Sequence, residues 1–88
     1  MKLEELEAFT AFVKLQSTSQ AALQLGITQP ALSRRIQSLE QTIDLKLFDR
    51  NTRPLKLTTI GLQVYEQSKK ILEETQKPDL IRFFYGLW

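Results

Sequence analysis

The feature that most constrains the fold of this chain is a set of turn and capping residues between two amphipathic stretches. Ala22 precedes Gly26 by one helical turn, and Thr28 and Pro30 follow the glycine. Glycine adopts the positive φ of a helix end without steric cost, threonine is a good N-cap, and proline is tolerated in the first helical turn. The pattern predicts that one helix ends near Leu25 and another begins after Thr28, forming a helix-turn-helix.

The second of these helices, which we expect to reach about residue 43, has one apolar and one polar face. Its apolar residues recur at helical spacing and are Leu32, Ile36, Leu39 and Ile43. At about 100° per residue, the opposite face is polar and nearly free of acids. That face consists of Pro30, Arg34, Gln37 and Gln41, with Ser33 at its edge. We expect the apolar face in the core and the polar face in solvent.

Apolar spacing and turn signals predict two further helices and a small hairpin, and they place the start of the first helix of the helix-turn-helix near residue 20. The helices cover residues 3–15, 20–25 and 58–76, and the β-compatible runs of the hairpin are residues 45–48 and 55–57. The predicted fold class is all-α, with three helices and a β-hairpin wing forming a winged helix-turn-helix, followed by a long helix.

This order of elements predicts three segments in the chain. Residues 1–57 form the winged helix-turn-helix and residues 58–76 the long helix. Residues 77–88 form a tail that holds four of the eight aromatic side chains and shows no helix or strand pattern.

Composition argues against catalysis. The chain contains no cysteine and no histidine, so thiolate chemistry, the commonest general base and the commonest metal ligand are missing. No pair of carboxylates has a nucleophile or base beside it. We therefore expect no enzymatic activity, no catalytic residue, no metal and no cofactor.

The sequence also gives no sign of membrane association. No apolar run approaches the ~20 residues that a bilayer-spanning helix needs, and the acidic start of the chain is unlike a signal peptide. We expect no membrane partner and a cytoplasmic location.

Positive charge is concentrated in the centre of the chain. The formal net charge is +2, and residues 34–56 carry six basic and three acidic side chains. Such a cluster is typical of polyanion binding, and a solvated surface of mixed charge explains it equally well.

The helix-turn-helix favours DNA as the partner, because the major groove accommodates one helix. There Arg34 is suited to guanine, Gln29 or Gln37 to adenine, and the helix N-terminus at Thr28 to a phosphate.

Several stretches of the sequence together match one family pattern. They are Phe9-x-Ala11-x-Val13, Ser17-x-Ser19-x-Ala21-Ala22, Thr28-Gln29-Pro30-Ala31-Leu32-Ser33-Arg34-x-Ile36-x-x-Leu39-Glu40, Leu47-Phe48-Asp49-Arg50 and Leu57-Thr58-x-x-Gly61. With these stretches, residues 1–75 resemble the N-terminal winged helix-turn-helix and linker helix of the LysR-type transcriptional regulators. The implied function is sequence-specific binding of double-stranded DNA for transcription regulation.

The resemblance implies which side chains contact DNA. At the start of the recognition helix, base and phosphate contacts are implied for Thr28, Gln29, Pro30, Ser33 and Arg34, and Arg35 at the flank is expected on a phosphate. In the wing, Arg53 is implied at the minor groove, with Arg50 and Lys56 nearer the DNA backbone.

The resemblance further implies that the helix over residues 58–76 joins two copies into a homodimer. Its expected contact residues are Gly61, Val64, Tyr65, Ser68, Ile71 and Leu72. LysR-type regulators carry an effector-sensing domain after this helix, for which 88 residues leave no room, so we expect no effector for this chain. The alternative function is a truncated interaction module that pairs with a full-length regulator without binding DNA itself.

Two wing residues have a second interpretation. Arg50 either lies near the DNA backbone or has a structural role, pairing with Glu40 or Asp49. Arg53 either enters the minor groove or only occupies the tip of a loop.

The sequence departs from the family pattern at three positions near helix ends. Gln16 and Thr18 replace a glycine and a phenylalanine at the entry to the second helix, which affects how that helix packs. Asp44 replaces a glycine between the recognition helix and the wing, and aspartate tolerates the positive φ expected there. The polar face of the recognition helix is unaffected.

Overall fold

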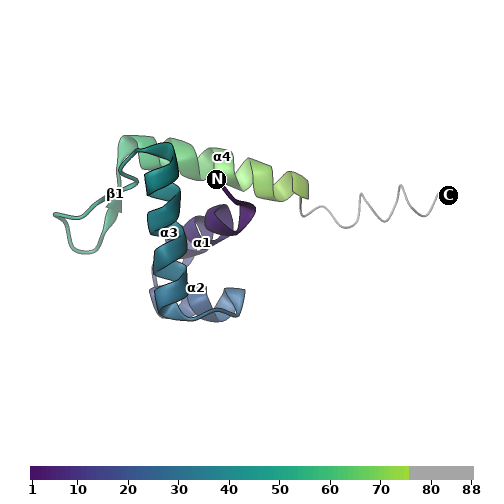
Figure 1. The fold of residues 1–88 in the computed structure, drawn as a ribbon. Coiled ribbons are helices and arrows are strands. Elements are labelled where there is room, and N and C mark those ends of the chain that lie inside the picture. Colours follow the sequence, from purple (N-terminus) through teal and green to yellow (C-terminus); the bar gives the residue numbers. More distant parts are fainter. Residues whose placement is uncertain (76–88) are drawn as a thin grey trace.

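The computed structural model describes residues 1–75, which form four helices and a two-stranded antiparallel sheet (Figure 1). In chain order the elements are α1 (Leu3–Leu15), α2 (Thr18–Leu25), α3 (Gln29–Ile43), β1 (Phe48–Asp49), β2 (Lys56–Leu57) and α4 (Thr59–Thr75). The hairpin of β1 and β2 projects to one side of the helices, and α4 runs towards the other. The predicted tail over residues 77–88 lies outside the described residues.

The second helix begins two residues earlier than the sequence predicted. We expected it to start at residue 20, whereas α2 starts at Thr18. The reason is that the hydroxyl of Ser17 accepts a hydrogen bond from the backbone N–H of Gln20 at 3.1 Å, so Ser17 is the N-cap. The end of α2 is as predicted, because Gly26 adopts a left-handed φ of 68°.

The boundaries of α3 also agree with its predicted capping residues. The Thr28 hydroxyl accepts a hydrogen bond from the backbone N–H of Ala31 at 3.2 Å, and the proline lies in the first turn. At the other end Asp44 adopts a φ of 54°. The left-handed residue expected between the recognition helix and the wing is therefore present.

The core lies where the four helices and the base of the wing meet, and α2 contributes the buried Ala21 and Ala22. Phe9, Leu32, Leu39 and Leu47 are fully buried there. The ring of Phe9 makes edge-to-face contacts with the rings of Phe48 and Tyr65, at centroid distances of 5.6 and 6.3 Å. These aromatic contacts join the first helix to the wing and to the last helix.

The wing is present, but its strands are shorter than predicted. β1 and β2 have two residues each, and Phe48 pairs with Leu57. The backbone N–H of Leu47 donates to the Glu40 carboxylate at 2.8 Å, and the Leu47 carbonyl accepts from the N–H of Thr58 at 3.0 Å. The residues before β1 are thus tied to the end of α3 and the start of α4 instead of to a second strand.

α4 packs closely against the rest of the chain at its first turn. The Thr58 hydroxyl accepts a hydrogen bond from the N–H of Gly61 at 3.0 Å, which confirms a threonine cap. Gly61 is buried, and a Cβ at this position would overlap the carbonyl of Leu47. Among the described residues, no helix combines the length and the hydropathy needed to cross a bilayer.

Candidate nucleic-acid interface

The polar side of α3 is open to solvent along the first half of the helix. Leu32, Ile36 and Leu39 are buried in the core. The exposed residues are Gln29, Pro30, Ser33, Arg34 and Gln37, and Arg35 at the flank is half-buried. No part of residues 1–75 covers this face, so the prediction of an uncovered polar surface is confirmed.

Two hydroxyl groups organise the N-terminus of α3. The Thr28 oxygen accepts the capping hydrogen bond, which leaves its own O–H free to donate to a phosphate. The Thr18 hydroxyl at the start of α2 donates to the side-chain carbonyl oxygen of Gln29 at 3.3 Å. This contact leaves the amide N–H groups of Gln29 as its free donors.

Arg34 and Arg35 line a shallow hollow between α3 and the start of α1. Lys2, Glu4, Glu5, Ala31 and Ser38 complete its lining. Within the described residues neither arginine forms an ion pair or a hydrogen bond. Both guanidinium groups are therefore available to an anionic ligand.

Glu5 is the buried charged residue beneath this hollow. The hydroxyl of Ser38 donates to one carboxylate oxygen at 2.5 Å, and the backbone N–H of Lys2 donates to the other at 3.1 Å. The bond from Ser38 is the main reason that the pKa of Glu5 lies below its usual value, although burial acts in the opposite direction. The carboxylate is consequently ionised at neutral pH.

In the wing, Arg50 makes one of the two contacts expected for its structural role. Its guanidinium donates to the Glu40 carboxylate at 2.9 Å, so Arg50 joins the hairpin to α3. About half of its side chain remains exposed. Arg53 donates from one nitrogen to the carbonyls of Arg50 and Thr52, at 3.0 and 3.1 Å, which fixes its side chain at the loop.

The remaining predicted wing residue lies in a second basic hollow. Lys56 on β2 is exposed and lines this hollow together with Lys46, Arg50, Asn51 and Thr59. The hairpin register places Lys56 opposite Asp49. Three cationic side chains thus surround the base of the wing.

The residues predicted for dimerisation fall into two groups. Gly61 and Ser68 are buried within the chain, and Ser68 is only 1% exposed. Ile71 is exposed, whereas Val64, Tyr65 and Leu72 are half-buried. Gly61 and Ser68 are therefore not available to contact a second copy, and the surface left for dimerisation is smaller than the predicted stripe.

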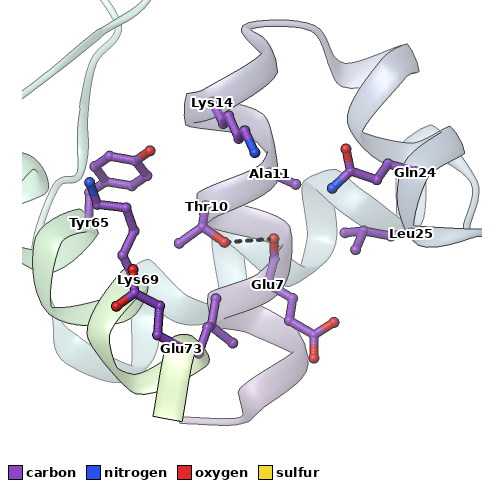
Figure 2. A pocket seen from close by; sticks show the side chains of 10 residues that line it. Glu7, Thr10, Ala11, Lys14, Gln24, Leu25, Tyr65, Lys69 and Glu73 are labelled. Carbon is purple, nitrogen blue, oxygen red and sulfur yellow. Dashed lines mark hydrogen bonds between the residues drawn. The ribbon is translucent and has the colours of Figure 1, made fainter. Parts of the chain in front are cut away.

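Figure 2 shows a hollow between α4, α1 and α2, which is lined by charged, polar and apolar side chains. Lys69 lies over the ring of Tyr65, with its Nζ 4.7 Å from the ring centroid. Lys14 of α1 and Gln24 of α2 line the opposite wall. Within the described residues there is no group of three or more side chains suited to a metal ion.

The helix-turn-helix and the wing coincide with a known family pattern. The sequence model described as the bacterial regulatory helix-turn-helix protein, lysR family, matches residues 3–62. The chain belongs to the LysR family. This LysR-family chain is 40% identical over 77 residues to the HTH-type transcriptional regulator BenM of Acinetobacter baylyi. The match covers 88% of this chain and 25% of the length of BenM, so the chain spans about a quarter of that relative.

Solved structures of other LysR-family proteins have the same fold. The crystal structure of the BenM DNA-binding domain in complex with catB site 1 DNA has a TM-score of 0.85 and 36% identity, covering 98% of this chain and 97% of that one. Vibrio fischeri DarR in complex with DNA gives a TM-score of 0.83 at 32% identity, covering 99% of this chain and 30% of DarR. The predicted family and fold class are confirmed.

Several residues of this LysR-family chain that shape the interface were not among the predicted site residues. Ser38 contacts Glu5 across 33 positions of sequence, and Thr18 contacts Gln29 across 11. Neither pair has a local sequence signal, because each forms only after two helices have packed. From the sequence, Lys46 was only one of the six basic residues in the centre of the chain. The folded hairpin brings it into the same hollow as Lys56.

Proposed function

We propose that this LysR-family chain binds double-stranded DNA in a sequence-specific manner and so takes part in transcription regulation. The observation that carries the proposal is the exposed polar face at the start of α3, backed by a buried apolar face. The similarity to a DNA-binding domain crystallised on DNA supports it over nearly the whole chain. Bacterial DNA lies in the cytoplasm, which is where we place this activity, and no catalytic step belongs to the proposal.

In this proposal, α3 enters the major groove with its N-terminal half. Arg34 donates to a guanine, and Gln37 and Gln29 contact neighbouring bases. The O–H of Thr28 and the guanidinium of Arg35 contact phosphates, while Pro30 and Ser33 lie against the groove wall. Phosphate contacts supply most of the affinity and its salt dependence, and base contacts supply the sequence preference.

The wing adds contacts to an adjacent part of the duplex. Arg53 extends into the minor groove, and its bonds to the loop carbonyls fix the direction of the side chain before DNA is bound. Lys56 and the exposed part of Arg50 lie near the backbone. Because Glu40 already pairs with Arg50, we assign Arg50 a smaller share of the phosphate attraction than Lys56.

We further propose that two copies associate through α4. An almost entirely apolar groove of about 350 Å³ runs along this helix and includes Leu45, Ile60, Val64 and Ile71. Exposed apolar surface of this kind is typical of an association site. A two-fold dimer requires a nearly palindromic DNA site, with half-sites one or more turns of ~34 Å apart.

The test is selection of duplexes from a random pool, followed by binding measurements at several salt concentrations. We expect an enriched, nearly palindromic sequence that binds with an affinity at least ~10³-fold above that of random DNA. We also expect a steep fall in affinity with salt. Binding without any enriched sequence would contradict sequence-specific recognition.

A second candidate function is pairing with a longer regulator without DNA binding. The observation that favours it is the exposure of two apolar side chains on α4, Leu62 at 51% and Ile71 at 39%. Sizing chromatography of the chain with and without a full-length LysR-family protein separates the two functions. If the chain forms mixed dimers with the full-length protein and binds no DNA duplex, the second candidate is favoured.

A further inference from the structure

We propose that Ser38 is a positioning residue of the DNA interface, because its hydrogen bond keeps the Glu5 carboxylate from pairing with Arg34 and Arg35. This inference rests on the proposed function, in which neither Ser38 nor Glu5 contacts DNA. Glu5 is only 6% exposed, and each of its two carboxylate oxygens accepts a hydrogen bond. One partner is at the start of α1, and the other is on α3.

The two arginines are the alternative partners of this carboxylate. On a helix, residues three and four apart are neighbours, so Arg35 and Arg34 lie on the same side of α3 as Ser38. All three line one hollow with Glu5, yet within the described residues neither arginine is paired. The Ser38 hydroxyl therefore occupies the carboxylate oxygen that faces the helix carrying both guanidinium groups.

Removal of that hydroxyl leaves a buried carboxylate oxygen without a donor. An unsatisfied buried charge is costly, and a guanidinium is a strong donor to a carboxylate. Two other cations act on the Glu5 carboxylate, the ammonium groups of Lys2 and of the N-terminus, but within the described residues neither donates a hydrogen bond to it. Glu4 is a possible partner for the arginines, but its exposed carboxylate gains little from a surface pair. A Ser38→Ala protein consequently recruits an arginine to Glu5, and that arginine is lost to DNA.

The test compares S38A in the natural background and in the E5Q background, with the DNA duplex selected above. In the natural background we expect about tenfold weaker binding, because one arginine no longer contacts DNA. If that arginine is Arg35, one phosphate contact is lost and the log–log salt slope is smaller by about 1. In the E5Q background S38A changes affinity less than twofold. Ser38→Thr keeps the hydroxyl and restores wild-type binding. Thr42→Val, one turn further along the same helix, removes a hydroxyl without effect.

A measurement without DNA separates this inference from the proposed function. In S38A, the Nε–H signal of Arg34 or Arg35 in NMR spectra becomes protected from solvent exchange, and E5Q abolishes that protection. Equal loss of affinity in both backgrounds, or exchange rates unchanged by S38A, overturns the role of Ser38. A wild-type chain that binds no duplex overturns the proposed function, while the exchange measurement still decides whether Ser38 controls the arginines.

Discussion

Arg34 and Arg35 are adjacent in sequence, but their surroundings differ. Arg34 is exposed on the polar face of α3, whereas Arg35 is half-buried at its flank. A side chain that contacts base edges contributes to the difference between cognate and random DNA, and a side chain that contacts only phosphate contributes equally to both. This difference in position around one helix is the reason that we propose different roles for two identical residues.

Substitution of Arg34 tests this difference. We expect Arg34→Ala to cost ~1–3 kcal/mol of binding free energy on the selected duplex and much less on random DNA. The matched control is Arg35→Ala, which we expect to weaken both complexes alike. Fluorescence anisotropy titrations with the two duplexes measure both effects. Equal losses for Arg34→Ala would restrict Arg34 to phosphate contact.

The ionisation of Glu5 makes the stability of the fold depend on pH. Its pKa in the folded chain is lowered, chiefly by the Ser38 hydrogen bond, so the carboxylate contributes stability above its unfolded pKa. That contribution is lost as the pH falls through the folded pKa. We expect the Tm of the wild type to decrease more steeply below about pH 4.5 than the Tm of Glu5→Gln. Parallel curves would contradict this assignment.

At the scale of the elements, local signals were sufficient to predict most of the helix ends, although the start of α2 was placed two residues too late. Gly26, Thr28 and Asp44 each determine a boundary through their own φ or hydroxyl group, and all three were predicted. The short strands and the partner of Arg50 were not determined by sequence alone. Both depend on Glu40, which lies on a different element and binds the Leu47 N–H as well as the guanidinium.

The close contact at the start of α4 predicts the sign of one substitution. In an exposed helix position, glycine to alanine stabilises by about 0.5–1 kcal/mol. At Gly61 the added Cβ meets the Leu47 carbonyl, so we expect Gly61→Ala to destabilise by about 1–3 kcal/mol. Urea denaturation measures the change, with Gln63→Ala at an exposed position of the same helix as control. A stabilised Gly61→Ala protein would show that the carbonyl can move away.

The wing predicts a different kind of effect, on salt dependence. Lys56 is exposed beside Lys46 and Arg50 and carries no ion pair within residues 1–75. We expect Lys56→Ala to weaken binding to all duplexes alike and to reduce the log–log salt slope by about 1. Titrations between low and moderate salt give this slope. An unchanged slope would remove Lys56 from the backbone contacts.

At the scale of the whole molecule, α4 is both part of the body and the proposed contact between two copies. Its inner side holds Gly61 and Ser68 against the chain, and Leu62 and Ile71 are exposed on its two opposite flanks. From the sequence, the stripe from Gly61 to Leu72 was predicted to be one dimerisation surface. Helical spacing alone does not distinguish residues buried within a chain from residues buried between two chains.

A charge at Ile71, on the flank of α4 that lines the apolar groove, separates these two roles. We expect Ile71→Asp to weaken dimerisation by at least about tenfold, because an unpaired carboxylate would be buried at the interface. The helix content of the monomer should remain unchanged, since Ile71 is 39% exposed. Analytical ultracentrifugation and circular dichroism measure the two properties, with Lys70→Gln as control. A dimer that survives the change would place the interface elsewhere.

The attachment of α4 to the hairpin has a geometric consequence. The Thr58 hydroxyl donates to the Lys46 carbonyl at 2.6 Å, and Gly61 in the first turn of α4 lies so close to the Leu47 carbonyl that a Cβ there would overlap it. A tilt of α4 therefore moves the base of the wing with it. In a pair of chains joined along this helix, its direction would set the separation between the two wings, and thereby the number of base pairs that one pair of chains spans.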